Sequence, residues 1–202
     1  MRILGNMTYG KWAFGVVVLA TSCFAAADEG KTVDLMPGDV APVFQGVDDG
    51  GKPWKSSDFV GQKYVVLYFY PGDFTPGCTR QAQNFRDAMN KLTEKGVLVI
   101  GVSEDAVKTH ELFKAAQKLN FTLLSDEDGS LAQKFGVPVG KGGEVKTKGA
   151  DGQPVTLTRK ATAARWTFVI GKDGKIAAKD TKVNPTKSSK DVAELIEKLE
   201  KQ

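Results

Sequence analysis

The sequence predicts an α/β fold in which helices cover both faces of a mixed central sheet. Two observations carry this prediction. Short apolar runs, suited to buried strands, alternate with longer amphipathic segments in the order strand, helix, strand, helix, strand between residues 64 and 135. Two further strands joined by a tight turn, and then a last helix, follow after residue 165. Helices between consecutive strands imply parallel pairing, whereas a tight turn implies an antiparallel pair, so the sheet is expected to be mixed.

The first 27 residues have the pattern of a secretory signal peptide. Arg2 and Lys11 precede an apolar run that is too short for a comfortable membrane span, and a run of three alanines follows it. We expect cleavage after Ala27, export to the periplasm, and no membrane association beyond this leader. A retained membrane anchor and lipoprotein processing at Cys23 are the alternatives. The folded domain is therefore expected to span residues 28–202.

The composition favours one globular domain with a nearly neutral surface. Hydrophobic residues make up 41% of the 202 residues, which is enough for a sizeable core. Removing the two basic residues of the leader from the 28 of the whole chain leaves 26 basic against 24 acidic residues, a net charge of +2. This balance argues against a nucleic-acid partner. Without the leader only Cys78 remains, and a free thiol in an oxidising compartment is a liability unless it has a use.

The strands are identified by apolar or β-branched runs that are bounded by turn residues. Residues 43–47 and 52–56 flank Asp48-Asp49-Gly50-Gly51, which predicts a hairpin. The aromatic run 64–70 does not alternate polar with apolar residues, so it is expected to be buried on both faces of the sheet. The other expected strands are 97–102, 121–124, 166–170 and 175–178, the last two joined by the turn Lys172-Asp173-Gly174.

The helices are identified by the spacing of their apolar residues. The first begins after Thr75 and ends at Gly96, the second spans 104–119, a short third lies within 126–135, and the fourth begins near Ser188. The buried face of the second helix is expected at Leu112, Ala115, Ala116 and Leu119, with His110 on a solvated face. Residues 139–164, rich in Gly, Lys and Thr, are expected to be an exposed insertion, either a loop or a β-excursion.

The segment from Pro71 to Cys78, PGDFTPGC, is where the sequence predicts chemistry. It joins the strand 64–70 to the first helix, in which Thr75 suits the N-cap and Pro76 the first helical position. Cys78 therefore lies in the first turn, where free N–H groups and the positive end of the helix dipole stabilise a thiolate. In such sheets ligands lie beyond the carboxyl ends of the strands, and Cys78 is expected at that edge. A buried structural cysteine is the alternative.

The pattern Pro71-x-x-x-Thr75-x-x-Cys78 resembles the active-site signature of the peroxiredoxins. The stretches GVSED (101–105), LLSDEDGSLAQKFGV (123–137) and RWTFVIGKDGKI (165–176) resemble the bacterioferritin comigratory protein branch of that family, also called peroxiredoxin Q. The resemblance runs from about Gly38 to Leu199, with residues 139–164 poorly matched. It implies a thioredoxin-like fold and the reduction of hydrogen peroxide or organic hydroperoxides.

The resemblance implies a role for each residue that matches the family's motif. Cys78 resembles the peroxidatic cysteine, and Thr75 resembles the threonine whose hydroxyl contacts the peroxide and the sulfur. Pro71 resembles the proline that shields the pocket, and Arg165 the distant arginine that reaches the sulfur. Gln81 falls where the family has Glu or Gln. Simpler interpretations stay open, with Thr75 only a helix cap, Arg165 a surface ion pair and Gln81 a residue on a polar helix face.

These roles agree with the chemistry of the side chains. Peroxide cleavage needs a thiolate, because a thiol is a poor nucleophile. Arg165 stays charged and favours both the thiolate and the developing negative oxygen, while the Thr75 hydroxyl can donate and accept hydrogen bonds. Backbone N–H groups at the helix start, around Gly77, are expected to bind the substrate oxygen. The expected product on Cys78 is a sulfenic acid.

Many members of this branch carry a resolving cysteine five positions after the peroxidatic one, and here that position is Gln83. The sequence therefore predicts a one-cysteine mechanism in a monomer, with an external thiol as resolving partner and reductant. Export argues against cytosolic thioredoxin as the direct donor. No metal-ligand cluster and no phosphate-binding glycine loop is present in the sequence, so no metal or cofactor is expected.

Two other functions stay open. One is a thiol–disulfide oxidoreductase on the same fold, against which the absence of a C-x-x-C pair argues. The other is a non-enzymatic redox sensor or binding module, whose lone thiol is oxidised once and read by a partner.

Overall fold

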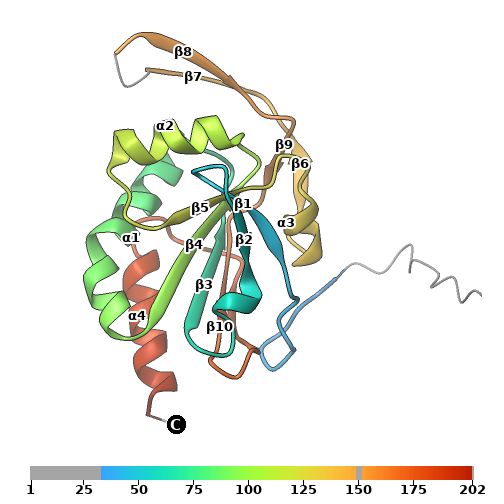
Figure 1. The fold of residues 1–202 in the computed structure, drawn as a ribbon, viewed down its shortest axis with the longest axis vertical. Coiled ribbons are helices and arrows are strands. Elements are labelled where there is room, and N and C mark those ends of the chain that lie inside the picture. The colour runs from blue at the N-terminus through green and yellow to red at the C-terminus, as the bar shows by residue number, and fades with distance from the viewer. Residues whose placement is uncertain (1–32, 149–151, 202) are drawn as a thin grey trace, which may run out of the picture. The chain divides into compact units, whose positions relative to one another are not determined.

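The computed structural model describes residues 33–148 and 152–201. The expected leader and Cys23 lie outside the described residues. In the described part a seven-stranded sheet is built from β1 (Gln45–Asp48), β2 (Pro53–Lys55), β3 (Tyr64–Phe69), β4 (Val97–Ser103), β5 (Thr122–Ser125), β10 (Trp166–Ile170) and β11 (Ile176–Asp180). Its strand order is β11-β10-β3-β4-β5-β1-β2 (Figure 1).

The pairing of these strands confirms the predicted mixed sheet. β3, β4 and β5 pair in parallel, whereas β10 is antiparallel to both β3 and β11. The predicted N-terminal hairpin is also present, because β1 pairs antiparallel with β2, and β1 adds antiparallel to β5 at the far edge. The crossover connections between the parallel strands run through helices, as parallel pairing requires.

β3 is the central strand, and all six of its residues are buried. Its side chains alternate between two hydrophobic cores, because successive residues of a strand point to opposite faces. Tyr64, Val66 and Tyr68 face one core, and Val65, Leu67 and Phe69 face the other. The unbroken apolar run in the sequence therefore reflects a strand covered on both sides.

Helices cover both faces of the sheet, as Figure 1 shows. They are α1 (Pro76–Glu94), α2 (Val107–Gln117), α3 (Ser130–Lys134) and α4 (Ser188–Leu199), and a 3₁₀ turn (Ser56–Asp58) follows β2. α1, α2 and α4 pack on the core that contains Tyr68, and α3 packs on the core that contains Phe69. The predicted stripe of α1 is buried as expected, at Ala82, Phe85, Met89 and Leu92.

The predicted buried face of α2 is wrong in part. Leu119, just after the helix, is buried as expected and Leu112 is half-buried, but Ala115 and Ala116 are exposed, whereas His110 and Phe113 are buried. The helix also begins at Val107 rather than at residue 104, so residues 104–106 form the connection from β4. The prediction failed because an apolar ranking places alanine in the core and histidine outside it, and it does not include a buried partner for the imidazole.

Residues 139–164 form two short two-stranded ribbons. β6 (Val139–Lys141) pairs with β9 (Ala161–Ala163), and β7 (Glu144–Lys148) pairs with β8 (Pro154–Thr158). The β7–β8 ribbon stands away from the seven-stranded sheet in Figure 1. The segment is nevertheless not uniformly exposed, because Leu157, Arg159 and Ala163 are buried.

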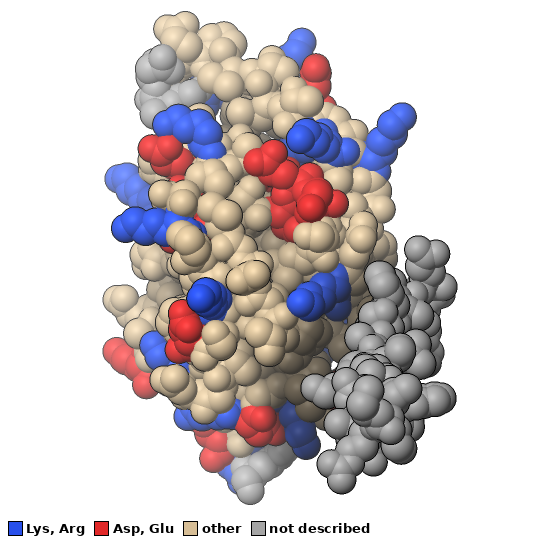
Figure 2. Space-filling view, turned by 45° about the vertical axis from the view of Figure 1, so that its right-hand side comes forward, with Lys and Arg blue, Asp and Glu red and all other residues tan. Residues whose placement is uncertain are grey.

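Within residues 33–148 and 152–201, no helix is long and apolar enough to cross a membrane. Lysine, arginine, aspartate and glutamate side chains are interspersed over the face shown in Figure 2.

Candidate active site

The loop from Pro71 to Thr75 leaves the carboxyl end of β3 and turns directly into α1. Thr75 is the N-cap residue and Pro76 the first residue of the helix, as predicted. The Thr75 hydroxyl does not cap the helix, however, but donates to the Gly72 carbonyl oxygen at 3.0 Å. Thr75 therefore closes the loop on itself. This bond uses the hydrogen of the hydroxyl group and leaves the lone pairs of its oxygen free to accept.

Cys78 lies in the first turn of α1 and is 1% exposed. Arg165 Nη2 lies 3.1 Å from the Cys78 sulfur, and Arg165 Nη1 donates to Gln81 Oε1. Arg165 thus places a positive charge directly against the sulfur. Gln81, one turn further along α1, holds the guanidinium in this position.

Strand pairing explains how Arg165 reaches a cysteine 87 residues away in the chain. β10 runs antiparallel to β3 with Trp166 opposite Phe69, so Arg165 arrives where β3 gives way to the loop. A Cβ atom at Gly77 would lie 3.3 Å from Arg165 Nη2, so a glycine there leaves room for the guanidinium.

The structure thus brings together four of the predicted site residues, namely Cys78, Arg165, Gln81 and Gly77. Thr75 and the half-buried Pro71 lie in the loop that leads to them. The interpretation of Gln81 as a residue on a polar helix face is wrong, because its side chain is fully buried. The interpretation of Arg165 as a surface ion pair is wrong as well, because its guanidinium contacts Gln81 and the sulfur.

Sequence reasoning missed a buried polar cluster behind the loop. The Asp73 carboxylate accepts a hydrogen bond from Tyr70 Oη at 2.8 Å and meets His110 Nδ1 at 2.8 Å. Arg159 Nε, from the end of the β7–β8 ribbon, lies 2.6 Å from Asp105 Oδ1. The prediction that His110 is solvated is therefore wrong, since the side chain is completely buried against Asp73. Asp73 and Asp105 do fall in the recognisable blocks PGDFTPGC and GVSED, which was the available signal.

Burial and the pairing of Asp73 with His110 shift the pKa of each of these two residues in opposite directions. Burial by itself lowers the pKa of His110, but the Asp73 carboxylate outweighs burial and raises that pKa above its ordinary value. Burial raises the pKa of Asp73, and the lowering influence of His110 offsets this only in part. Glu104 lies nearby in sequence, and burial raises its pKa to about 7.

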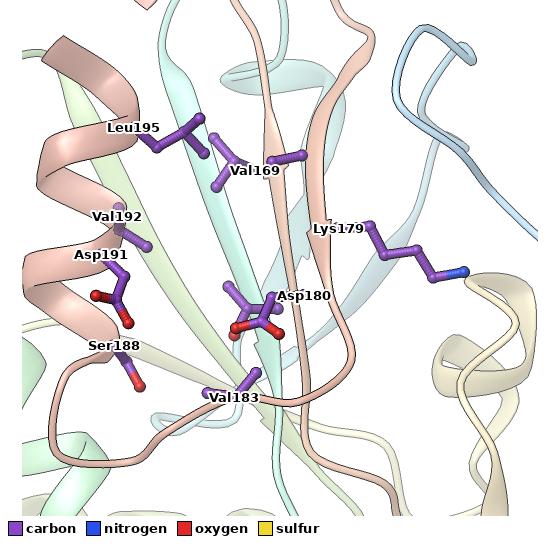
Figure 3. Close-up of a pocket in the computed structure, with 10 residues that line it drawn as sticks. Val169, Lys179, Asp180, Val183, Ser188, Asp191, Val192 and Leu195 are labelled. Carbon is purple, nitrogen blue, oxygen red and sulfur yellow. The ribbon is translucent and has the colours of Figure 1, made fainter. Parts of the chain in front are cut away.

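A separate cavity of about 120 Å³ lies between α4 and the β10–β11 pair (Figure 3). Its lining includes apolar side chains and two carboxylates, from Val169, Val192, Leu195, Asp180 and Asp191. The Thr167 hydroxyl, in the same wall, is buried with no hydrogen-bond partner within the described parts of the chain. No residue from Pro71 to Cys78 lines this cavity, so it is distinct from the site around the sulfur.

Comparison with known proteins places these features in a family. A family model described as the AhpC/TSA family matches residues 37–179. A putative peroxiredoxin bcp from Coxiella burnetii is 41% identical over 164 residues, which cover 80% of this chain and 97% of that protein.

Solved structures give the same result for the fold. A mutant of PrxQ from Xylella fastidiosa superimposes with a TM-score of 0.69 at 26% identity, covering 83% of this chain and 99% of that one. The bacterioferritin comigratory protein from Xanthomonas campestris, studied for its alkyl peroxide reduction activity, gives a TM-score of 0.62 at 28% identity, covering 77% of this chain and 91% of that one.

Proposed function

The chain belongs to the AhpC/TSA family, within its bacterioferritin comigratory protein and peroxiredoxin Q branch, and we propose that it reduces hydrogen peroxide and organic hydroperoxides through Cys78 alone. The observation that carries this proposal is the Arg165 guanidinium 3.1 Å from the sulfur, at the start of a helix. Family membership supports thiol peroxidase activity. The alkyl peroxide reduction activity studied in the Xanthomonas relative supports organic hydroperoxides as substrates.

In the oxidation step the Cys78 thiolate attacks the terminal oxygen of the hydroperoxide. The S–O bond forms as the O–O bond breaks, and the departing alkoxide takes up a proton and leaves as an alcohol, or as water from hydrogen peroxide. Arg165 stabilises the negative charge as it moves from sulfur to the leaving oxygen. The Thr75 hydroxyl, whose hydrogen is directed at the Gly72 carbonyl oxygen, has lone pairs that can accept a hydrogen bond from the hydroperoxide O–H.

The reduction step requires a thiol from outside the chain. At the position of the usual resolving cysteine, Gln83 instead donates to Gln117 Oε1 at 2.8 Å, and Cys78 is the one free cysteine in the described residues. An external thiol therefore attacks the sulfenic acid and releases water, which leaves a mixed disulfide on Cys78. A second thiol then attacks the sulfur of the first external thiol, which releases Cys78 as a thiolate and leaves a disulfide between the two external thiols.

We further propose that the protein acts outside the cytoplasm as a monomer. The signal-peptide pattern of residues 1–27 supports export, and after cleavage at Ala27 an identical partner subunit would have no second cysteine with which to resolve the sulfenic acid. The mass of the protein recovered from a periplasmic fraction, followed by sedimentation velocity, tests both statements. An uncleaved leader would contradict export, and a dimer would contradict the monomeric state.

The activity is tested in a Cys23→Ser background, in which Cys78 is the remaining cysteine. Stopped-flow oxidation with hydrogen peroxide and with cumene hydroperoxide, followed by trapping of the sulfenic acid and mass spectrometry, measures the first step. We expect oxidation faster than that of free cysteine by about a thousandfold or more, and none in Cys78→Ser. Oxidation at the rate of free cysteine would show that the motif has no peroxidatic role.

The burial of Cys78 favours a redox sensor as second candidate, because an external thiol cannot reach a sulfur that is 1% exposed unless the loop moves. Rapid oxidation that stops at one equivalent of peroxide, with glutathione, dithiothreitol and thioredoxin each supplied in excess, would favour the sensor. Sustained turnover with any of these thiols favours the peroxidase.

A further inference from the structure

We propose that Arg159, carried by the β7–β8 ribbon, is a positioning residue that locks the Cys78 loop, and that its release gives the external thiol access to the oxidised sulfur. This inference rests on the proposed one-cysteine peroxidase. It assigns a role to the 139–164 segment, which is poorly matched in the resemblance to the family.

Arg159 and Asp105 together hold both ends of one residue of the loop. Arg159 Nη2 donates to the Asp73 carbonyl oxygen at 2.5 Å, and the Asp73 N–H donates to Asp105 Oδ2 at 2.7 Å. The arginine and the aspartate are themselves paired, and both are almost completely buried. The backbone N–H and the backbone carbonyl of Asp73 are thus both held by one ion pair, which joins the ribbon to the connection after β4.

Two glycines make room for this contact. A Cβ atom at Gly72, whose φ is +150°, would lie 2.1 Å from Arg159 Nε, so the guanidinium passes over the loop where it has no side chain. A Cβ atom at Gly142 would lie 2.1 Å from the Arg159 carbonyl oxygen. The approach of the Arg159 side chain to the loop therefore depends on Gly72, and the position of the Arg159 backbone within its own segment depends on Gly142.

The loop conformation that Arg159 holds is strained at the next residue. Phe74 has φ +60°, in the left-handed region that a phenylalanine rarely adopts. Such a residue persists only when its surroundings fix it. Asp73 is pinned on one side of Phe74, and on the other side Thr75 is bonded to the Gly72 carbonyl oxygen. Release of Arg159 removes one of these anchors, so the strain then favours opening.

The catalytic cycle needs both states of the loop. Oxidation requires the closed loop, in which Thr75 and Cys78 are held in place, and a hydroperoxide meets the sulfur with its terminal oxygen alone. An external thiol must instead bring its sulfur to the side of the Cys78 sulfur opposite the new S–O bond, and a sulfur that is 1% exposed gives no room for this while the loop is closed. The ribbon is suited to be the moving part, because most residues of β7 and β8 are exposed and make few buried contacts. Leu157 and Arg159 are the buried residues that tether its end.

The two half-reactions are measured separately by stopped flow in Arg159→Gln and in Lys160→Gln, an exposed neighbour, both in the Cys23→Ser background. For Arg159→Gln we expect oxidation by hydrogen peroxide to slow by about tenfold and reduction of the sulfenic acid by 2-mercaptoethanol to accelerate severalfold. Both rates should stay within about twofold in Lys160→Gln. Loss of stability alone moves the two rates together, so a parallel change, or no change, overturns the proposal.

Amide hydrogen exchange of the protein with its native Arg159 gives a test that does not depend on a variant. The Asp73 amide bonds to Asp105 and the Ala163 amide bonds to Glu104, so undocking of the whole 139–164 segment, which carries both Arg159 and Ala163, should expose both amides with the same opening free energy. Protection that differs by about tenfold or more between these amides overturns the proposal. If the protein with native Arg159 is oxidised no faster than free cysteine, the proposed function fails. The exchange test still decides, independently of that result, whether the 139–164 segment and the Cys78 loop open together.

Discussion

Replacing Glu104 with glutamine should change how stability depends on pH. Glu104 is 2% exposed, and its Oε2 accepts the Ala163 amide at 2.7 Å, whereas Oε1 has no hydrogen-bond partner within residues 33–148 and 152–201. Burial is the main cause that raises its pKa from 4.5 to about 7, and the nearby carboxylates of Asp126 and Asp105 add to the rise. The carboxyl group is therefore stabilised in its protonated form.

The sign follows from the proton balance. Between pH 4.5 and 7 the folded state holds a proton on Glu104 that the unfolded state releases, so the free energy of unfolding falls as the pH rises through this range. A shift from 4.5 to about 7 corresponds to at most about 3 kcal/mol, and we expect about 1–2 kcal/mol because the site relaxes on ionisation. Above about pH 8 the effect is complete.

Urea unfolding at pH 5, 6, 7 and 8.5 measures this effect in the unmodified protein, in Glu104→Gln, and in Glu127→Gln as a matched change at an exposed glutamate. Glutamine keeps an acceptor for the Ala163 amide but cannot ionise. Glu104→Gln should match the unmodified protein at pH 5 and exceed it by about 1–2 kcal/mol at pH 8.5, and Glu127→Gln should not. Equal pH profiles for the unmodified protein and Glu104→Gln would refute the reasoning, since the other titrating groups are common to both.

Three further predictions concern the site. Arg165→Gln should slow oxidation of Cys78 by hydrogen peroxide by about a hundredfold to a thousandfold in stopped flow, because the positive charge at the sulfur is lost; oxidation at an unchanged rate would exclude that role. Thr75→Val should slow the same step by about tenfold or more and lower the free energy of unfolding by about 1 kcal/mol, through the lost bond to the Gly72 carbonyl oxygen. His110→Phe should lower the free energy of unfolding at pH 7 by about 2–4 kcal/mol in urea unfolding, because it leaves the buried Asp73 carboxylate without its imidazole partner; an unchanged stability would show that the pairing does not matter.

Some elements followed from the sequence because their signals are local. The order of strands and helices could be predicted from apolar spacing, and so could the position of Cys78 in the first turn of a helix, because the strand, Thr75 and Pro76 lie within a few residues of it. The face of α2 could not be predicted in this way. Its buried side is decided by the fit of His110 to Asp73, which is 37 residues away in the chain.

The sequence by itself determined the strand–loop–helix that presents Cys78 and, through resemblance, the family and the candidate residues Thr75, Arg165 and Gln81. Only the tertiary structure showed that Gln81 is buried and holds the Arg165 guanidinium against the sulfur. It alone also brought Arg159 to Asp73 across 86 residues of chain. The physical reason is that propensity and periodicity act over a few residues, whereas a buried ion pair forms only where the folded chain brings both partners out of water together.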